Sequence, residues 1–225
     1  MRVRNSIEKL RWLLSAAALV AAPVAAHAGE VEGWKAGDIV VKSGVAVILF
    51  NSSAEVKVNG VDVPGAGARL TNNVTPSLEL EYFPTRDVSV VIIGGLPPKN
   101  SAYATGSIDA LGEVGRVRYG LAVAVARYHI NASKRFSPFV SLGAGRYIIF
   151  STEDRSVKNL KATGGWGPFF QAGADYHFNR HVGFQGTVSF IPIKSDASGT
   201  SNGVPITART TINPLIVKGA LFYRF

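Results

Sequence analysis

Apolar and polar residues alternate along the end of the chain, from Asn213 to Phe225. Counting back from Phe225, every second residue forms an apolar face, and the mixed face between them carries Lys218 and Arg224. Because side chains alternate across a strand, this stretch predicts a single β-strand. An apolar face that ends in aromatic residues is typical of the last strand of an outer-membrane barrel. The alternative is an edge strand of a soluble sandwich, which is usually protected by charge.

Similar alternation recurs upstream and predicts seven further strands. They cover residues 38–50, 71–83, 88–96, 115–130, 136–150, 166–178 and 181–193, and the last strand follows Pro205. Long loops, at 51–69, 97–114, 151–163 and 194–205, alternate with short turns. Short turns at one end and long loops at the other are typical of outer-membrane barrels, and an even strand number allows closure. We therefore predict an all-β fold, an eight-stranded antiparallel up-and-down transmembrane β-barrel over residues 38–225.

The first 28 residues have the pattern of a secretory signal peptide. Four basic residues lie within residues 1–11, an uncharged stretch follows, and Ala26-His27-Ala28 forms a small-x-small cleavage site. We expect cleavage after Ala28 and a periplasmic segment over residues 29–37. Cleavage removes four basic residues and one acidic residue, which lowers the net charge from +9 to +6. The remaining basic residues are scattered, so nucleic acid is not an expected partner.

The sequence carries little enzyme chemistry. The absence of cysteine excludes disulfides, thiol catalysis and cysteine metal sites. The G-x-S-x-G pattern at 199–203 lacks the following helix that a hydrolase elbow needs, and its Ser, Gly and Asn neighbours favour a loop. His177 and His181 have a metal-pair spacing only on a helix, whereas Asn179-Arg180 between them indicates a turn. We expect these histidines and His129 at the periplasmic rim, and we expect neither an enzyme nor a cofactor or metal.

Inward-facing residues can be given a height, because successive strands run in opposite directions. The lower and middle lumen is predicted to be polar, with Gln171, Asp175, Gln185 and Arg224 among its residues. There we predict one charge network of Lys42, Glu79, Glu81 and Lys218, because the first strand should pair with the second and the last. Buried charges are expected to be paired, since an isolated buried charge is costly.

The upper lumen is predicted to be apolar. Its predicted lining is Ile48, Ile93, Ile149, Phe169, Ile191, Ile193 and Ile216. Small residues are predicted to face inward beside it and leave room, namely Gly120, Ala122, Ala124, Gly143 and Gly145. The alternative is that side chains simply fill an eight-stranded barrel. Filling does not account for an apolar upper half that is open to water, so we favour a ligand-lining vestibule.

Four segments carry a family resemblance. Residues 136–145, 166–176, 191–194 and the ending from Asn213-Pro214 to Phe225 together resemble the OmpW family, including its alkane-importing AlkL branch, over roughly residues 38–225. The resemblance implies a narrow barrel in the outer membrane of a Gram-negative bacterium. It also implies an apolar channel that moves small hydrophobic molecules and releases them sideways into the membrane. Tyr223 and Phe225 resemble the terminal signal read by the barrel-assembly machinery.

The predicted function is therefore passive uptake of small hydrophobic molecules, with outer-membrane lipid and these solutes as partners. Proline cannot donate a ladder hydrogen bond, so we place the candidate lateral gap beside Leu96, Pro97 and Pro98. The alternative function is a structural or adhesive barrel with a sealed lumen, whose outer loops bind partners. A polar-solute porin is disfavoured, since eight strands leave too little bore for a water-filled pore.

Overall fold

The computed structural model describes residues 33–225, so the predicted signal peptide lies outside the described residues. Almost all secondary structure is β-strand, with one short 3₁₀ helix, η2 (Asp109–Leu111). The strands are β1 (Ile39–Val58), β2 (Val61–Asp62), β3 (Ala66–Leu70), β4 (Asn73–Tyr82), β5 (Val88–Gly95), β6 (Lys99–Gly106), β7 (Glu113–His129), β8 (Phe136–Asp154), β9 (Lys158–Ala162), β10 (Gly165–His177), β11 (Val182–Phe190), β12 (Ile193–Ser201) and β13 (Val204–Arg224). Within residues 33–225, no helix has the length and apolar character needed to cross a membrane.

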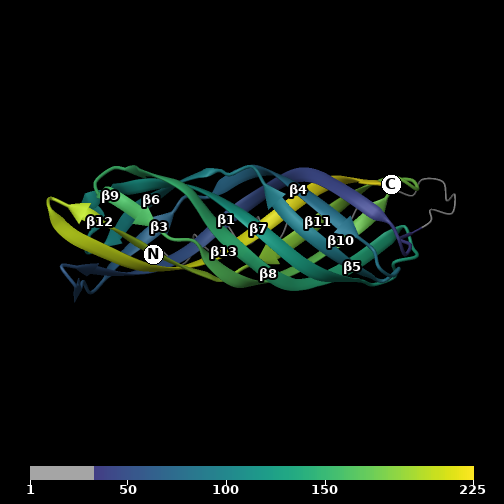
Figure 1. Ribbon diagram of the computed structural model, residues 1–225, viewed down its shortest axis with the longest axis horizontal. Coiled ribbons are helices and arrows are strands. Elements are labelled where there is room, and N and C mark those ends of the chain that lie inside the picture. Colours follow the sequence, from purple (N-terminus) through teal and green to yellow (C-terminus); the bar gives the residue numbers. More distant parts are fainter. Residues whose placement is uncertain (1–32) are drawn as a thin grey trace, which may run out of the picture. The chain divides into compact units, whose positions relative to one another are not determined.

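Eight of these strands form a closed ring. In order around it they are β1, β4, β5, β7, β8, β10, β11 and β13, each antiparallel to the next (Figure 1). Pairing of β1 with β13 closes the sheet, in a register that runs from Val40 opposite Arg224 to Val58 opposite Ile206. The predicted eight-stranded up-and-down barrel is confirmed.

The prediction that the four long connections are loops is wrong in one respect, because they contain further strands. β6 pairs with β7 and β3 with β6, while β12 pairs with β13 and β9 with β12. The G-x-S-x-G pattern is the β12–β13 hairpin, where Asn202 and Gly203 take positive φ values of 51° and 80°. These strands gather at the end of the barrel opposite Phe225 (Figure 1). Since long connections face outward in outer-membrane barrels, the wall continues beyond the membrane on the outer side.

The outward face of the ring is apolar. Its exposed side chains include Val74, Leu78, Leu80, Ile92, Val140, Leu142, Phe170, Val188, Val217 and Leu221. Exposed aromatic residues gather near the short turns, namely Tyr82, Tyr128, Phe136, Phe178, Tyr223 and Phe225. An apolar band edged by aromatic residues is the lipid-facing surface of a transmembrane barrel.

The predicted faces of β7 are reversed. Tyr119, Val123 and Val125 are buried in the lumen, whereas Ala122 and Ala124 face outward. The reason lies across the ladder, where Val123 is opposite Gly145 and Val125 is opposite Gly143. These glycines on β8 leave the inward space that the β7 valines fill, and a Cβ added to Gly143 would lie 2.8 Å from Val125 Cγ1. Gly120, also predicted to face inward, belongs to the same face of β7 as Ala122 and Ala124.

Candidate functional site

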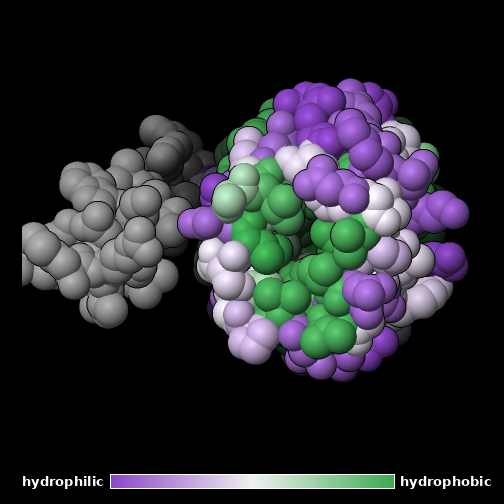
Figure 2. Space-filling view, turned by 90° about the vertical axis from the view of Figure 1, so that its left-hand side faces the viewer, coloured by the Kyte–Doolittle hydropathy of each residue, from purple (hydrophilic) through white to green (hydrophobic). Residues whose placement is uncertain are grey.

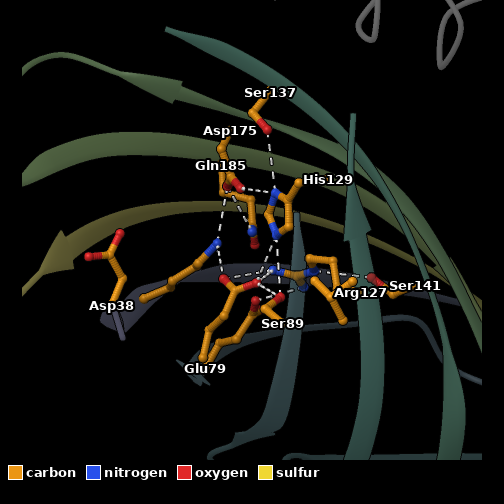
Figure 3. Close-up of polar contacts among 12 residues, drawn as sticks. Asp38, Glu79, Ser89, Arg127, His129, Ser137, Ser141, Asp175 and Gln185 are labelled. Carbon is orange, nitrogen blue, oxygen red and sulfur yellow. Dashed lines mark hydrogen bonds and ion pairs between the residues drawn. The ribbon is translucent and has the colours of Figure 1, made fainter. Parts of the chain in front are cut away.

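Six charged side chains meet in the middle of the lumen. They are Lys42 on β1, Glu79 and Glu81 on β4, Arg127 on β7, Asp175 on β10 and Lys218 on β13, each at most 6% exposed. Lys42 Nζ lies 2.6 Å from Glu81 and 3.1 Å from Asp175. Lys218 forms an ion pair with Glu79. The four residues predicted as a charge network thus lie within one larger cluster, part of which is drawn in Figure 3.

Arg127 is the hub of this cluster (Figure 3). Its guanidinium nitrogens lie 2.8 Å from Glu79 and 3.0 Å from Glu81, and it also donates to Ser141 and Gln171. Guanidinium is suited to this position because it offers five donors in a fixed planar arrangement. Three cations face three carboxylates, so the cluster is neutral without its histidine. This balance is what makes the burial of six charges tolerable.

Two histidines lie inside the barrel, not at its rim as predicted. His129 Nε2 is 3.1 Å from Glu81, and its Nδ1 is 3.6 Å from Asp175. His177 is fully buried, while His181 is exposed in the β10–β11 turn and its Nδ1 lies 2.9 Å from the Arg224 carbonyl oxygen. Residues 33–225 contain no group of three or more potential ligands that could hold a metal ion.

Trp34 closes the lower end of the lumen. It is 1% exposed and packs on Phe83 and His177, with ring centroids 4.7 and 4.4 Å away, and on Phe222. Its backbone N–H donates to Ala132 at 2.7 Å, which fixes the chain inside the barrel mouth. Below the charged cluster, the lumen is therefore filled by an aromatic layer that includes part of the predicted periplasmic segment.

The upper lumen is apolar. All seven residues predicted to line it belong to one cluster or pack against it, together with Val91, Tyr119, Val123, Val125, Tyr147 and Ile212. Viewed from the outer end, hydrophobic side chains surround a central hollow, and hydrophilic residues form much of the rim (Figure 2). The arrangement offers an apolar surface at the outer end of the barrel.

A cavity of about 70 Å³ lies between the apolar cluster and the charged one. Ile48, Phe169 and Ile216 line its apolar side, and Gln171 and Lys218 line the side toward the charges. The cavity also reaches the wall, where its lining includes Gly94, Gly95, Leu96, Pro98, Gly120 and Leu121. Its size corresponds to a few water molecules or a short hydrocarbon segment, about 30 Å³ being the volume of one water in the liquid.

The wall beside this cavity is incompletely paired. The β5–β7 ladder stops at Ile93 opposite Val123, and the β6–β7 ladder starts only at Lys99 opposite Arg118. Between the two ladders the β5 end stays bonded to β4, where the Leu96 N–H donates to the Pro76 carbonyl at 3.2 Å, and one backbone bond crosses to β7, from the Tyr119 N–H to the Pro98 carbonyl at 3.2 Å. We call this stretch, between residues 94–98 and residues 119–122, the β5–β7 seam. The candidate gap residues Leu96, Pro97 and Pro98 lie in it.

Sequence reasoning missed Arg127, His129 and Trp34. Arg127 shares the alternation of Val123 and Val125, which were predicted to face lipid, and His129 was predicted at the periplasmic rim. An arginine that faces lipid is costly, whereas a tyrosine suits the aromatic rim. Arg127 and Tyr128 together therefore indicated the correct orientation of β7, with Arg127 facing inward and Tyr128 facing outward. Trp34 precedes the first strand, and no periodic pattern includes it.

Comparison with known proteins agrees with this architecture. Outer membrane protein AlkL of Ectopseudomonas oleovorans is 27% identical over 194 residues, which cover 86% of this chain and 84% of AlkL. The solid-state NMR structure of AlkL in lipid bilayers has a TM-score of 0.69, covering 89% of this chain and 95% of that one. The dibenzothiophene metabolism operon protein PahQ of Pseudomonas aeruginosa is 28% identical over 182 residues, 81% of this chain and 86% of PahQ.

A further similarity concerns the fold alone. The crystal structure of outer membrane protein OprG from Pseudomonas aeruginosa has a TM-score of 0.82 at 20% identity, and the match covers 87% of this chain and 99% of OprG. The OmpW family pattern matches residues 35–225, which is nearly all of the described barrel. The chain is an outer-membrane β-barrel, and it belongs to the OmpW family.

Proposed function

We propose that the barrel carries small hydrophobic molecules passively from the outside into the outer membrane. The observation that carries the proposal is the division of one lumen into an apolar outer half and a charged, filled inner half. The seven predicted lining residues, from Ile48 to Ile216, are the proposed ligand surface. An apolar molecule gains free energy when this surface replaces water, by about 25 cal/mol for each Å² buried.

Entry is proposed from the outer end. A second cavity, of about 880 Å³, lies there among β1, β2, β3, β9, β12 and β13, and its lining is largely polar, with Glu55, Lys161 and Arg209 beside Val56. Below it the lining becomes apolar, so a hydrophobic solute is drawn inward. Polar solutes gain nothing from this lining.

Direct passage to the periplasm is unfavourable. A solute leaving the cavity downward meets Lys218 and Glu79 first, and then Arg127, Glu81 and Lys42. Separating buried ion pairs costs several kcal/mol, about 3–5 for removal of one partner. Below them Trp34 occupies the lumen.

Lateral exit is proposed through the β5–β7 seam. Leu96 lines the cavity and is also 66% exposed, so this part of the wall faces both the lumen and the surroundings. Opening it breaks few backbone hydrogen bonds, since the β5–β7 ladder has already ended at Ile93. Pro97 and Pro98 have no N–H with which to complete the ladder.

The solute class is supported by the relatives. The resemblance to the AlkL branch suggests alkanes, and PahQ is named for dibenzothiophene metabolism. Dibenzothiophene is an uncharged aromatic compound, which suits the same apolar lining as an alkane. We therefore propose uncharged hydrocarbons and aromatic compounds as solutes.

The test is uptake of labelled octane and dibenzothiophene by cells that carry either the wild-type barrel or a variant. Ile216→Trp should fill the cavity and abolish the barrel-dependent uptake, while the protein still folds and reaches the outer membrane. Val217→Trp, at the adjacent exposed position of β13, is the matched control and should leave uptake unchanged. Equal uptake by cells with and without the barrel would favour the structural or adhesive role instead.

The lateral route has a separate test. Because the chain has no cysteine, Leu96→Cys and Gly120→Cys can be joined across the seam by a short bifunctional thiol reagent. With a bis-methanethiosulfonate reagent, which joins each thiol through a disulfide, the crosslink should slow uptake, and its reduction by dithiothreitol should restore uptake. The control joins Val90→Cys to Ala126→Cys, which are directly opposite in the intact β5–β7 ladder. Normal uptake through the crosslinked seam would show that the exit lies elsewhere.

A further inference from the structure

Three side chains form a row on the outer surface of the barrel. Arg146 on β8 and Trp166 on β10 are directly opposite in the ladder, and the guanidinium carbon lies 5.3 Å from the indole ring centroid. On the other side of β10, the backbone of Lys194 on β12 lies against Gly165, the residue before Trp166, since a Cβ added to Gly165 would lie 2.1 Å from the Lys194 carbonyl oxygen. All three side chains are exposed and face away from the lumen. Trp166 thus has Arg146 stacked on its ring, and a second basic residue lies on the strand on its other side.

The row lies at the outer boundary of the lipid-facing band. Arg146 is ten residues beyond Phe136, where β8 begins, and Lys194 is twelve residues beyond Val182, where β11 begins. At about 3.3 Å per residue and a tilt of about 40°, these lengths reach about 25–30 Å above the short turns. An outer-membrane apolar band is about 25 Å tall. Below the row, the exposed residues on the same strands are apolar, as at Leu142 and Phe170.

The two cations of the row have no acidic partner. Two other exposed basic residues of the outer end do have one, since Lys99 pairs with Glu153 at 2.6 Å and Arg209 with Asp196 at 3.2 Å. Within residues 33–225, no carboxylate lies within ion-pair distance of Arg146 or Lys194. A guanidinium and an ammonium without a carboxylate partner, and a neutral indole N–H donor, therefore lie at the depth where lipid head groups begin.

We propose that the row Arg146–Trp166–Lys194 binds a phosphate of the outer leaflet's phosphorylated glycolipid, lipid A. Arginine matches phosphate with two parallel N–H donors, and lysine adds a point charge. Basic residues beside a membrane attract anionic head groups. The acyl chains of the lipid lie along the apolar strip below, between Leu142 and Phe170. This is a lipid site on the outside of the barrel, separate from the lumen and independent of the proposed uptake.

The site borders the β5–β7 seam. Arg146 is opposite Ala122 on β7, and Ala122 belongs to the stretch of β7 that β5 has left. A glycolipid held at Arg146 therefore lies next to the β5–β7 seam. The acyl chains of that glycolipid are then the ones that face the seam.

The proposal is tested by native mass spectrometry of the purified barrel. Three probes are compared, namely bisphosphorylated lipid A, lipid A without phosphates, and phosphatidylglycerol. We expect retention of bisphosphorylated lipid A, and a loss of at least tenfold in the Arg146→Gln/Lys194→Gln double variant, because hydrogen bonds to charged groups are stronger than neutral ones. Arg180→Gln, at an exposed position in the β10–β11 turn at the opposite end, should bind like the wild type.

Each other outcome overturns the assignment. Equal retention of phosphate-free lipid A would mean that the row is only an interfacial anchor. Equal retention of phosphatidylglycerol would mean that the site takes any anionic lipid. Unchanged binding by the double variant would place the phosphate elsewhere. Because both substituted side chains are exposed, loss of folding is not expected, and heat-dependent mobility on SDS gels checks the fold of every variant.

Discussion

The ion pair between Glu79 and Lys218 provides a direct test of how the buried charges stabilise the barrel. Glu79 contacts two cations, Lys218 and Arg127, whereas within residues 33–225 Glu79 is the one carboxylate at ion-pair distance from Lys218. The perturbations are Glu79→Gln, Lys218→Met and the two together. Both substitutions nearly preserve side-chain volume, so a change in stability reports on charge and not on packing.

The magnitudes follow from burial and contact. At an effective dielectric constant of about 20, unit charges about 3 Å apart attract by about 5.5 kcal/mol, and desolvation opposes this. Breaking a buried pair by removing one partner typically costs about 3–5 kcal/mol. We expect the stability loss of Glu79→Gln to lie at the upper end of this range, because the substitution also removes one of the carboxylates that contact Arg127. The double variant removes both charges, so its loss should fall short of the sum by about 2–3 kcal/mol.

The assay is reversible urea unfolding of the barrel in lipid vesicles, with the free energy of unfolding taken from each titration. The control cycle uses the exposed pair of Lys57 and Asp62, 3.3 Å apart with side chains 49% and 73% exposed. Exposed pairs contribute at most about 1 kcal/mol, so this cycle should show little coupling.

Additive losses for Glu79→Gln and Lys218→Met would refute the reasoning. They would mean that each charge is stabilised independently, for example by water, and that the cluster does not act as a unit. Equal coupling in the buried and exposed cycles would have the same consequence.

Three further outcomes are expected. Trp34→Ala should lower the free energy of unfolding by about 3–5 kcal/mol, as loss of a buried tryptophan does, in the same urea titration. Gly44→Ala should prevent folding, seen as loss of the heat-modifiable gel band, because the new Cβ would lie 2.0 Å from the Gly219 carbonyl oxygen across the closing seam. The backbone N–H of Leu160, 3.0 Å away, and that of the preceding residue lower the pKa of the Asp154 carboxyl in the outer extension below its ordinary 3.8. The stabilisation contributed by the ionised Asp154 carboxylate should therefore be complete above pH 3.8 and lost as the pH falls through the lowered pKa. An NMR titration that compares the wild type with Asp154→Asn measures this.

Much of the barrel could be predicted from alternation alone. β13 shows why, since its buried and exposed residues alternate from Leu215 to Phe225 as the sequence indicates. The faces of β4, β10 and β11 follow equally well, because charged and amide side chains mark the lumen in each. The outer strands could not be predicted, because β9 and β12 are rich in polar residues on both faces and form by pairing with long neighbours.

The site was predictable on strands whose own residues show which face points into the lumen. Lys42 and Glu79 were placed correctly by this means, whereas β7 presents small residues to lipid and valines to the lumen. That choice depends on Gly143 and Gly145 of β8, which are distant from β7's own pattern. Whether side chains on two neighbouring strands fill each other's space depends on both strands. The alternation of residues within one strand therefore cannot reveal it.

The positions of the lumen cations have a consequence for how the barrel forms. Lys42 and Lys218 belong to β1 and β13, the two strands of the last seam, and their acidic partners lie on β4 and β10. In a sheet that is still open, these charges would face lipid, at a cost of about 2.5–3.5 kcal/mol each. Partly closed states in the membrane are therefore disfavoured, and the transition to the closed form should be all-or-none. The charges proposed to block solute from the lower lumen thus also make folding cooperative.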